Sequence, residues 1–186
     1  MAEDYSSWAA RWRVPLGFAM ALALVVLSQP RWPTLLVGGI VGLPGLALRG
    51  AAAGWLEKGQ ELATQGPYGH VRNPLYLGSF IIGAGFAIAA ASWILAALFV
   101  VFFLAVYLPV VRREGKELRR RFGAEYEDYS ASVPALVPSL KRARAHGDSQ
   151  PAAGFRWKLY RKNREYEAAL GYAAGLLFLA IKMKLR

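Results

Sequence analysis

The polar segment around Arg72 holds residue types that could bind an anionic ligand. Asn73 and Pro74 follow this arginine, and the pair favours a helix start with Asn as the N-cap and Pro in the first turn. The free backbone N–H groups of such a start, together with the guanidinium, suit a carboxylate or a phosphate. Tyr68 and Tyr76 add flat faces for an aromatic ligand. A capped helix with interfacial aromatic residues and a snorkelling arginine explains the same residues, so the segment alone leaves both interpretations open.

A second polar segment begins at Glu114, the first acidic residue after an uncharged run of 39 residues, 73–111. This position predicts a carboxylate at or just inside the membrane interface. An ionised carboxylate there needs a partner, and Arg113, Lys116 or a bound cation would serve. We expect the apolar helix to continue past Glu114 as an amphipathic helix that ends at Gly123.

The composition is that of a basic membrane protein. Of 186 residues, 55% are hydrophobic, and 23 Lys and Arg stand against 12 Asp and Glu; soluble domains usually reach about 45–50% apolar residues. The absence of cysteine excludes disulfides, thiolate metal sites and a cysteine nucleophile, and two distant histidines make a metal centre unexpected. Nucleic-acid binding is the competing interpretation of the charge, but no nucleic-acid module accompanies it.

Three uncharged runs predict the spanning helices of an all-α, polytopic membrane helix bundle. The longest run, 73–111, is too long for one span of about 20 residues and suits two helices with a turn between them. No strand followed by a GxGxxG turn and a helix appears, so no Rossmann domain is expected. We predict four spanning helices, at 14–29, 34–55, 74–91 and 93–111.

The basic residues predict the orientation in the membrane. Residues 112–186 hold 17 basic and 8 acidic side chains, and the positive-inside rule assigns this part, with the N-terminus and the active site, to the cytoplasm. We therefore expect an integral membrane protein, in the cell inner membrane if the source is bacterial. Arg49, within the second apolar segment, either snorkels to the interface or lines a polar cavity.

The last apolar segment, 168–181, predicts a fifth, C-terminal helix whose placement the sequence leaves open. Its 14 residues are few for a spanning helix, and spanning would carry Lys182, Lys184 and Arg186 outward, against the positive-inside rule. A helix that lies in the interface or docks on the bundle fits the length. Both placements remain possible at this point.

Two ordered motifs lie within residues 60–140. The first is GPY at 66–68 followed by VRNPLY at 71–76. The second starts at Glu114, continues as FGAEYEDY, and ends with two Val-Pro pairs. In order and spacing they resemble the signatures GPY…VRHPxY and EExxL…FGxEYxxY…VP…P of the isoprenylcysteine carboxyl methyltransferase and phospholipid methyltransferase family.

This resemblance implies an integral membrane enzyme that uses S-adenosyl-L-methionine, releases S-adenosyl-L-homocysteine, and needs no metal. It also implies that the two motifs enclose the cofactor. The cofactor-binding residues it implies are Leu62, Tyr68, His70, Arg72, Asn73, Pro74, Leu75, Tyr76, Gly83, Gly85 and Glu114. The expected catalytic residues are Arg112, Arg113 and Glu114. Helix packing is the competing interpretation of Gly83 and Gly85.

The chain departs from the family pattern at three positions. Asn73 stands where the family usually has histidine, and Gly115 replaces the second acid of the EE pair. Val110 stands where the carboxyl methyltransferases have an arginine that is thought to hold the substrate carboxylate. Arg112 or Arg113 is the expected substitute, although both project from other faces of the helix.

The basic pair beside a lone Glu114 favours carboxyl O-methylation of an isoprenylcysteine-like acceptor. One alternative is N-methylation of a phosphatidylethanolamine-type phospholipid, and another is a non-enzymatic membrane scaffold or transporter with a degenerate cofactor site. The expected partner is a lipid or prenylated small molecule, with no nucleic acid and no metal. The expected organisation is an N-terminal transmembrane helix pair (1–56), a methyltransferase core (57–140), a linker (141–154), and a basic segment with the C-terminal apolar helix (155–186).

Overall fold

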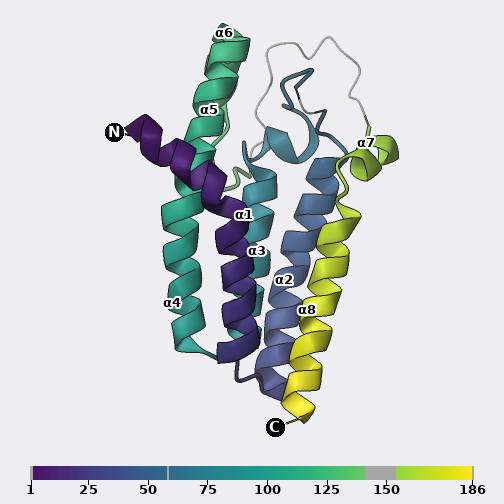
Figure 1. The fold of residues 1–186 in the computed structure, drawn as a ribbon. Helices are drawn as coiled ribbons and strands as arrows, with labels where there is room; N and C mark the ends of the chain where they lie inside the picture. Colours follow the sequence, from purple (N-terminus) through teal and green to yellow (C-terminus); the bar gives the residue numbers. More distant parts are fainter. Residues whose placement is uncertain (1, 58, 141–153, 186) are drawn as a thin grey trace.

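A computed structural model describes residues 2–57, 59–140 and 154–185, and these residues form helices and no strand. The helices stand side by side as a bundle (Figure 1). They are α1 (Ala2–Leu27), α2 (Trp32–Ala53), the 3-10 helix η1 (Gly66–Gly69), α3 (Pro74–Ala89), α4 (Trp93–Phe102), the π-helix η2 (Phe103–Tyr107), α5 (Leu108–Phe122), α6 (Ala124–Ser132), α7 (Trp157–Lys162) and α8 (Tyr166–Lys184). The predicted all-α membrane bundle without a Rossmann domain is confirmed, whereas the predicted linker 141–154 lies outside the described residues except for Gly154.

By length and composition, four helices of the described chain can cross a membrane. They are Tyr5–Leu27, Trp32–Ala53, Trp93–Phe122 and Tyr166–Lys184. The third helix, Pro74–Ala89, is apolar but has only 16 residues, which is about 24 Å of helix and shorter than a bilayer core of about 30 Å. The sequence therefore located five apolar helices, but the C-terminal one has the length of a span and α3 does not.

Glycines let α2 and α3 pack backbone against backbone. A Cβ atom built on Gly85 would lie 2.6 Å from the carbonyl oxygen of Gly38, and one on Gly45 would lie 2.6 Å from that of Gly78. Contacts this short leave no room for a side chain, and small residues at such positions are the usual means by which helices associate in lipid. This tight pair holds the start of α3 in a defined position beside α2.

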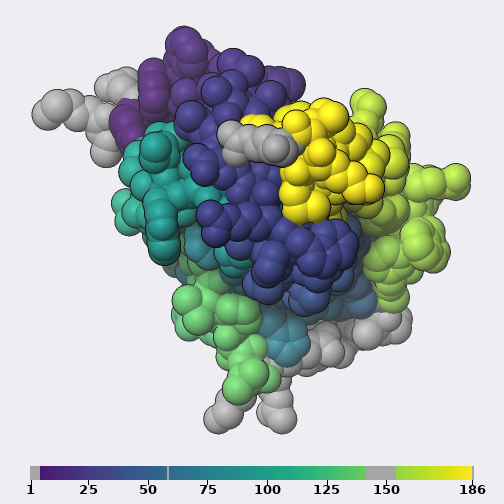
Figure 2. All heavy atoms as spheres, turned by 90° about the horizontal axis from the view of Figure 1, so that it is seen from below, coloured from purple at the N-terminus to yellow at the C-terminus, as the bar shows by residue number. Residues whose placement is uncertain are grey.

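Helix α8 runs along α2 over the length of the bundle, and its C-terminal end lies against α1 and α2 (Figure 2). Tyr172 donates a hydrogen bond to the carbonyl of Gly39. Near its end, Lys182 Nζ donates to the carbonyl of Val25 at 2.6 Å and to Ser28 Oγ at 3.1 Å. By its length and its course along the bundle, α8 is therefore a candidate spanning helix. The positive-inside rule argued against it, but Lys182 is used locally to cover carbonyl groups at the end of α1.

Helices α4, η2 and α5 form one continuous helix with a π-turn in the middle. Ser92 caps its start by accepting a hydrogen bond from the backbone N–H of Leu95. Pro109 follows the π-turn and has no N–H to donate, so a change in hydrogen-bond register just before it is physically expected. The helix ends at Gly123, as predicted, where φ is +54°. It therefore carries Glu114 from the apolar bundle into the polar end of the molecule.

Helix α1 starts well before residue 14, where its predicted span begins. Its first part leans away from the axis of the rest (Figure 1), and Pro15 lies inside the helix. Tyr5, Trp8 and Trp12 follow one another along this part, with ring centroids 5.7 and 6.3 Å apart. Tyr5 also donates to the carbonyl of Ala105 at 2.8 Å. Aromatic side chains of this kind prefer the membrane interface, and they bring the first part of α1 over η2.

Candidate functional site

Hydrogen bonds join the segment that precedes α3 to α6 and to the residues after α6. Tyr129 donates its hydroxyl to the carbonyl of Tyr68 at 2.8 Å. The backbone N–H of Arg72 donates to the carbonyl of Pro134 at 2.9 Å, and Asn73 Nδ2 donates to that of Ala135 at 3.0 Å. The two sequence motifs, separated by a pair of apolar helices, therefore meet at the same end of the bundle.

One cavity of about 630 Å³ lies where these motifs meet, which is within the usual range of about 300–1,000 Å³ for small-molecule sites. Arg72 and Glu114 both line it, as the sequence hypothesis requires. Of the other expected cofactor-binding residues, the cavity is lined by Leu62, Tyr68, Asn73, Pro74, Leu75 and Tyr76.

Arg72 lines the cavity, and one of its buried donors has no partner among the described residues. Its Nη1 donates to the hydroxyl of Tyr126 at 3.3 Å. Its Nε is buried and has no hydrogen-bond partner among the described residues. A buried donor left unpaired costs about 1–3 kcal/mol, so this atom suits an acceptor oxygen supplied by a ligand. The carboxylate of S-adenosylmethionine is such an acceptor, and the residues of the cavity therefore fit that cofactor.

The start of α3 lies beside this donor. Asn73 is the N-cap residue and Pro74 is in the first turn, as expected, but the Asn73 side chain makes no capping hydrogen bond. Its Nδ2 donates to the carbonyl of Ala135, and its Oδ1 accepts no capping hydrogen bond, so the first backbone N–H groups of α3 have no side-chain cap. This arrangement favours an anion over an internally capped helix end.

Glu114 finds a partner that the sequence did not indicate. Tyr76 donates its hydroxyl to Glu114 Oε1 at 2.5 Å, and Arg13 Nη1 donates to the Tyr76 hydroxyl at 3.0 Å. Arg13 comes from α1 and lines the cavity. The expected partners were Arg113, Lys116 or a bound cation. The chain Arg13–Tyr76–Glu114 instead holds the carboxylate in place while its second oxygen remains for a ligand.

Arg112 and Arg113, the two expected catalytic arginines, do not line the cavity. Arg112 is exposed, and Arg113 Nε pairs with Glu117 Oε1 at 2.9 Å, so Arg113 reaches only the edge of the cavity through Glu117, which lines it. Successive residues on an α-helix point about 100° apart. When Glu114 faces the cavity, its two predecessors must face elsewhere. The structure brings Arg13 and Arg49 to the cavity instead.

Three expected cofactor-binding residues lie outside the cavity lining. His70 Nδ1 lies 2.9 Å from the carbonyl oxygen of Ser139 and helps to hold the segment after α6. Gly85 packs against α2, and a Cβ on Gly83 would collide with the ring of Phe99. Helix packing, the competing interpretation of the two glycines, accounts for both.

The replacement of the second family acid by Gly115 has a structural reason. A Cβ built on Gly115 would lie 3.0 Å from the hydroxyl of Tyr126, the same hydroxyl that accepts a hydrogen bond from Arg72. A Cβ at position 115 would require the Tyr126 hydroxyl to move by a few tenths of an ångström. Gly115 therefore leaves room for the hydrogen bond between Arg72 and Tyr126.

Two tyrosines at the edge of the cavity are buried, and burial raises the pKa of both above the usual value of about 10. For Tyr68, the neighbouring Tyr129 and Glu114 raise the pKa further, because a phenolate beside them would add a like charge. For Tyr129, the charge of Arg72 acts in the opposite direction without cancelling the effect of burial. Both hydroxyls therefore stay protonated at neutral pH.

We expect these two tyrosines to ionise after the solvent-exposed tyrosines in an alkaline titration. Because their folded pKa exceeds the unfolded value, their contribution to stability is complete below about pH 10 and is lost as pH rises further. Phenolate absorbance of the folded protein, and of Tyr129→Phe, measures this. Loss of one late-titrating group in the variant is the expected result. Simultaneous ionisation of all nine tyrosines near pH 10 would contradict it.

These features define the class of the protein: an all-helical bundle suited to a membrane, with a small-molecule cavity at its polar end. Residues 37–125, slightly less than half of the chain, match the family model for phospholipid methyltransferases, so the chain is similar to that family over these residues. The resemblance inferred from the two motifs is thereby confirmed. Members of that family transfer methyl groups to lipid-like molecules. The match therefore supports a membrane methyltransferase.

The chain is also similar to two curated proteins. It is 29% identical over 143 residues to the nickel-cobalt-cadmium resistance protein NccN of Alcaligenes xylosoxydans xylosoxydans, a match that covers 72% of this chain and 66% of the relative. It is 28% identical over 138 residues to the cobalt-zinc-cadmium resistance protein CzcN of Cupriavidus metallidurans, covering 69% of this chain and 62% of that relative. The chain thus matches slightly less than two thirds of each relative. No solved structure matches it.

Proposed function

We propose that this chain is an S-adenosylmethionine-dependent methyltransferase whose acceptor is a lipid-borne carboxylate, such as that of an isoprenylcysteine-like molecule. The observation that supports this most directly is the unpaired, buried Nε of Arg72 in the same cavity as Glu114. Together they offer a donor for the cofactor's carboxylate and an acceptor for its ammonium or ribose hydroxyl groups. The family match of residues 37–125 supports methyl transfer to a lipid-like molecule and does not specify the acceptor group.

The residues of the cavity divide the work of binding between them. Arg72 and the first turn of α3 hold an anionic end, and Glu114, fixed by Tyr76, holds a donor-rich group. Pro74 and Leu75 provide apolar contact for a purine ring. When bound, S-adenosylmethionine supplies an electrophilic methyl group on a sulfonium. The protein then has mainly to align the acceptor with that group and to exclude water.

The choice of acceptor follows from the charges that line the cavity. A carboxylate is already ionised at neutral pH and needs a cation rather than a general base. The cavity lining includes Arg13, Arg49 and Arg121 in addition to Arg72. An amine acceptor, as in the N-methylation of a phosphatidylethanolamine-type phospholipid, requires a proton acceptor and gains nothing from added cations. The lining also includes Glu57, Glu61, Glu114 and Glu117, and these carboxylates, with the phospholipid methyltransferase match of residues 37–125, favour the amine alternative.

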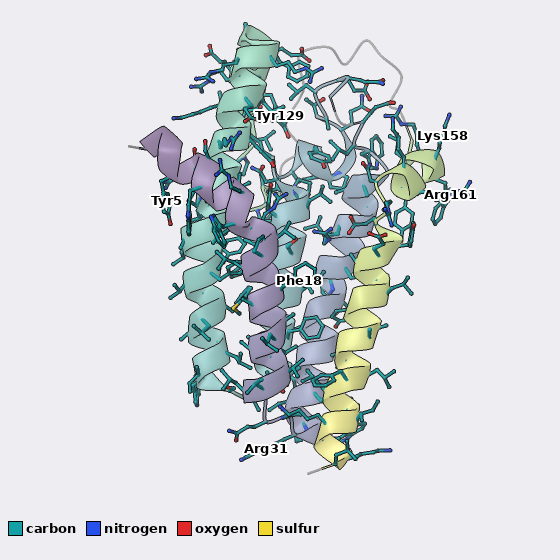
Figure 3. All side chains as sticks on the ribbon, viewed as in Figure 1. Tyr5, Phe18, Arg31, Tyr129, Lys158 and Arg161 are labelled. Carbon is teal, nitrogen blue, oxygen red and sulfur yellow. The ribbon has the colours of Figure 1, made fainter. Side chains whose placement is uncertain are left out.

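The distribution of basic side chains supports a cytoplasmic cavity. Lys158 and Arg161 on α7 lie at the same end of the bundle as Tyr129, whereas Arg31 lies at the opposite end (Figure 3). Basic residues collect on the cytoplasmic side of membrane proteins. We therefore propose that this end of the bundle faces the cytoplasm.

Transfer of a labelled methyl group separates the candidate functions. The purified protein is incubated with S-adenosylmethionine labelled in the methyl group and, in parallel, with a farnesylated N-acetylcysteine or with phosphatidylethanolamine. We expect label in the farnesylated product that alkali releases as methanol, as a methyl ester requires. Alkali-stable label in the phospholipid would establish the amine reaction instead.

A non-enzymatic scaffold or transporter predicts a different result. It requires that S-adenosylhomocysteine fail to bind to folded protein, which calorimetric titration measures directly. The relatives' names concern resistance to metals and give no substrate. Among the described residues, no group of three or more His, Cys, Asp and Glu side chains is placed to hold a metal ion. The proposal therefore rests on the cavity and on the family.

A further inference from the structure

A second cavity, of about 500 Å³, lies within the apolar part of the bundle. Its walls come from α1, α3, α4, η2 and α8 and are mostly aliphatic and aromatic, including Met20, Leu24, Ile82, Phe86, Phe99 and Phe103. Arg49, Ser79 and Tyr107 line this cavity and the first one as well. The two spaces therefore adjoin at these three side chains, one space suited to a cofactor and the other to an apolar chain.

All three guanidinium nitrogens of Arg49 donate hydrogen bonds at this junction. Its Nε donates to Glu165 Oε1 at 2.6 Å and its Nη2 donates to Glu165 Oε2 at 3.0 Å. Its Nη1 donates to Ser79 Oγ at 2.5 Å and to the carbonyl of Leu75 at 3.3 Å. The guanidinium thus binds a carboxylate through two parallel hydrogen bonds, which is the geometry that arginine offers to carboxylates and phosphates in general.

The carboxylate at this place belongs to the chain itself. Glu165 is only 6% exposed and precedes α8, outside the region 37–125 that defines the family. Its position does not depend on Arg49 alone, because Asn163 Nδ2 donates to the carbonyls of Ala53 and Leu56, each at 2.9 Å. A carboxylate beside the cofactor cavity is also the group that the proposed reaction must bring there.

We propose that Arg49 is the residue that anchors the anionic group of the lipid acceptor, with the apolar tail in the second cavity, and that Glu165 occupies this anchor while no acceptor is bound. This inference rests on the proposed function for the identity of the ligand as an acceptor. It also accounts for Val110, which stands where the carboxyl methyltransferases have an arginine. In this chain Arg49 of α2 would hold the substrate carboxylate instead. Ser79 supports the guanidinium from its other side.

Two binding measurements test the anchor. The probes are a farnesylated N-acetylcysteine and its methyl ester, which share the tail and differ in the charge. The full chain is used in phosphatidylcholine nanodiscs, and the ratio of the two dissociation constants is the quantity compared. We expect Arg49→Lys, which keeps the charge but loses the two-pronged geometry, to reduce the preference for the carboxylate about tenfold. Arg31→Gln, at the opposite end of the bundle, should leave the ratio unchanged.

Glu165→Gln should change the affinity for the carboxylate probe in the opposite direction from Arg49→Lys. If Glu165 competes for the anchor, its neutralisation raises the fraction of protein able to bind, and the carboxylate probe should bind about tenfold tighter while the ester does not change. A purely structural ion pair gives another pattern: both variants melt at lower temperature and neither alters the ratio of the two probes. That pattern overturns the proposal, as does weaker binding of the carboxylate by Glu165→Gln.

A third arm distinguishes the two kinds of anion that the anchor could hold. Phosphatidylethanolamine carries a phosphodiester, and an Arg49-dependent affinity for it instead of the carboxylate would assign the anchor to the phosphodiester. Failure of the proposed function is seen separately, because binding of S-adenosylhomocysteine and methyl transfer are measured on the native protein. If that ligand binds and transfer occurs while Arg49→Lys retains the full carboxylate preference, the anchor is wrong and the enzyme assignment stands.

Discussion

Replacing Arg72 with glutamine is expected to weaken the binding of S-adenosylhomocysteine by about 10- to 100-fold. The variant removes the unpaired Nε donor and the positive charge beside the start of α3. A hydrogen bond to a charged group contributes about 1.5–3 kcal/mol, and about 1.4 kcal/mol corresponds to tenfold in affinity. Because the unliganded protein leaves this donor unsatisfied, loss of the group should cost little stability. Calorimetric titration and a thermal melt together measure both effects.

Arg112→Gln is the matched control for this experiment. The sequence alone placed Arg112 in the catalytic set, whereas the structure places its side chain in solvent and away from the cavity. Affinity for S-adenosylhomocysteine should therefore change less than about twofold, as for a typical exposed charge. Equal losses in Arg72→Gln and Arg112→Gln would refute the assignment of the cavity as the cofactor site.

Glu114→Gln is expected to lower kcat/KM for methyl transfer by about 10- to 100-fold. The amide keeps the shape of the side chain and can still accept the hydrogen bond from Tyr76, which is 2.5 Å long in the native protein. What it loses is the negative charge that would bind the cofactor's ammonium or hydroxyl donors, an interaction of about 1.5–3 kcal/mol. The expected loss is therefore in the affinity for the cofactor, seen as a raised KM for S-adenosylmethionine.

Glu125→Gln is the corresponding control, because it removes an equal charge from an exposed position in α6. It should leave both kcat and KM within about twofold of the native values. A loss of kcat in Glu114→Gln without any change in affinity for S-adenosylhomocysteine would contradict its role as a cofactor ligand. That result would instead assign Glu114 to the acceptor, as the amine alternative requires.

Local patterns in the sequence were sufficient to predict much of the fold. Uncharged runs located the apolar helices, and Gly123 marked the end of α5. The length of α8 was underestimated because Lys182 and Lys184 were read as outside the helix, although the helix includes both. The role of Lys182 depends on the end of α1, more than 150 residues away in the chain, and no local pattern contains that information.

The site was predicted unevenly for the same reason. The residues from Tyr68 to Tyr76 lie in one short segment with recognisable turn and helix-start chemistry, and most of them line the cavity. Arg13 and Arg49 arrive from α1 and α2, where the sequence showed only isolated charges near apolar runs. Of the two interpretations of Arg49, snorkelling to the interface or lining a polar cavity, the structure agrees with the second. The helical rotation that takes Arg112 away from the cavity was visible in the sequence, but the missing family arginine argued for keeping it.

The passage of α8 along the bundle has a consequence for the two aqueous compartments. Five apolar helices run between the ends of the bundle, so the beginning of α1 and the end of α8 lie at opposite ends (Figure 1). If the whole bundle lies across a membrane, these two ends of the described chain face different compartments. A soluble factor that recognises the Lys184 end would then have no access to the cavity at the other end, and any signal between them would have to travel through the helices themselves.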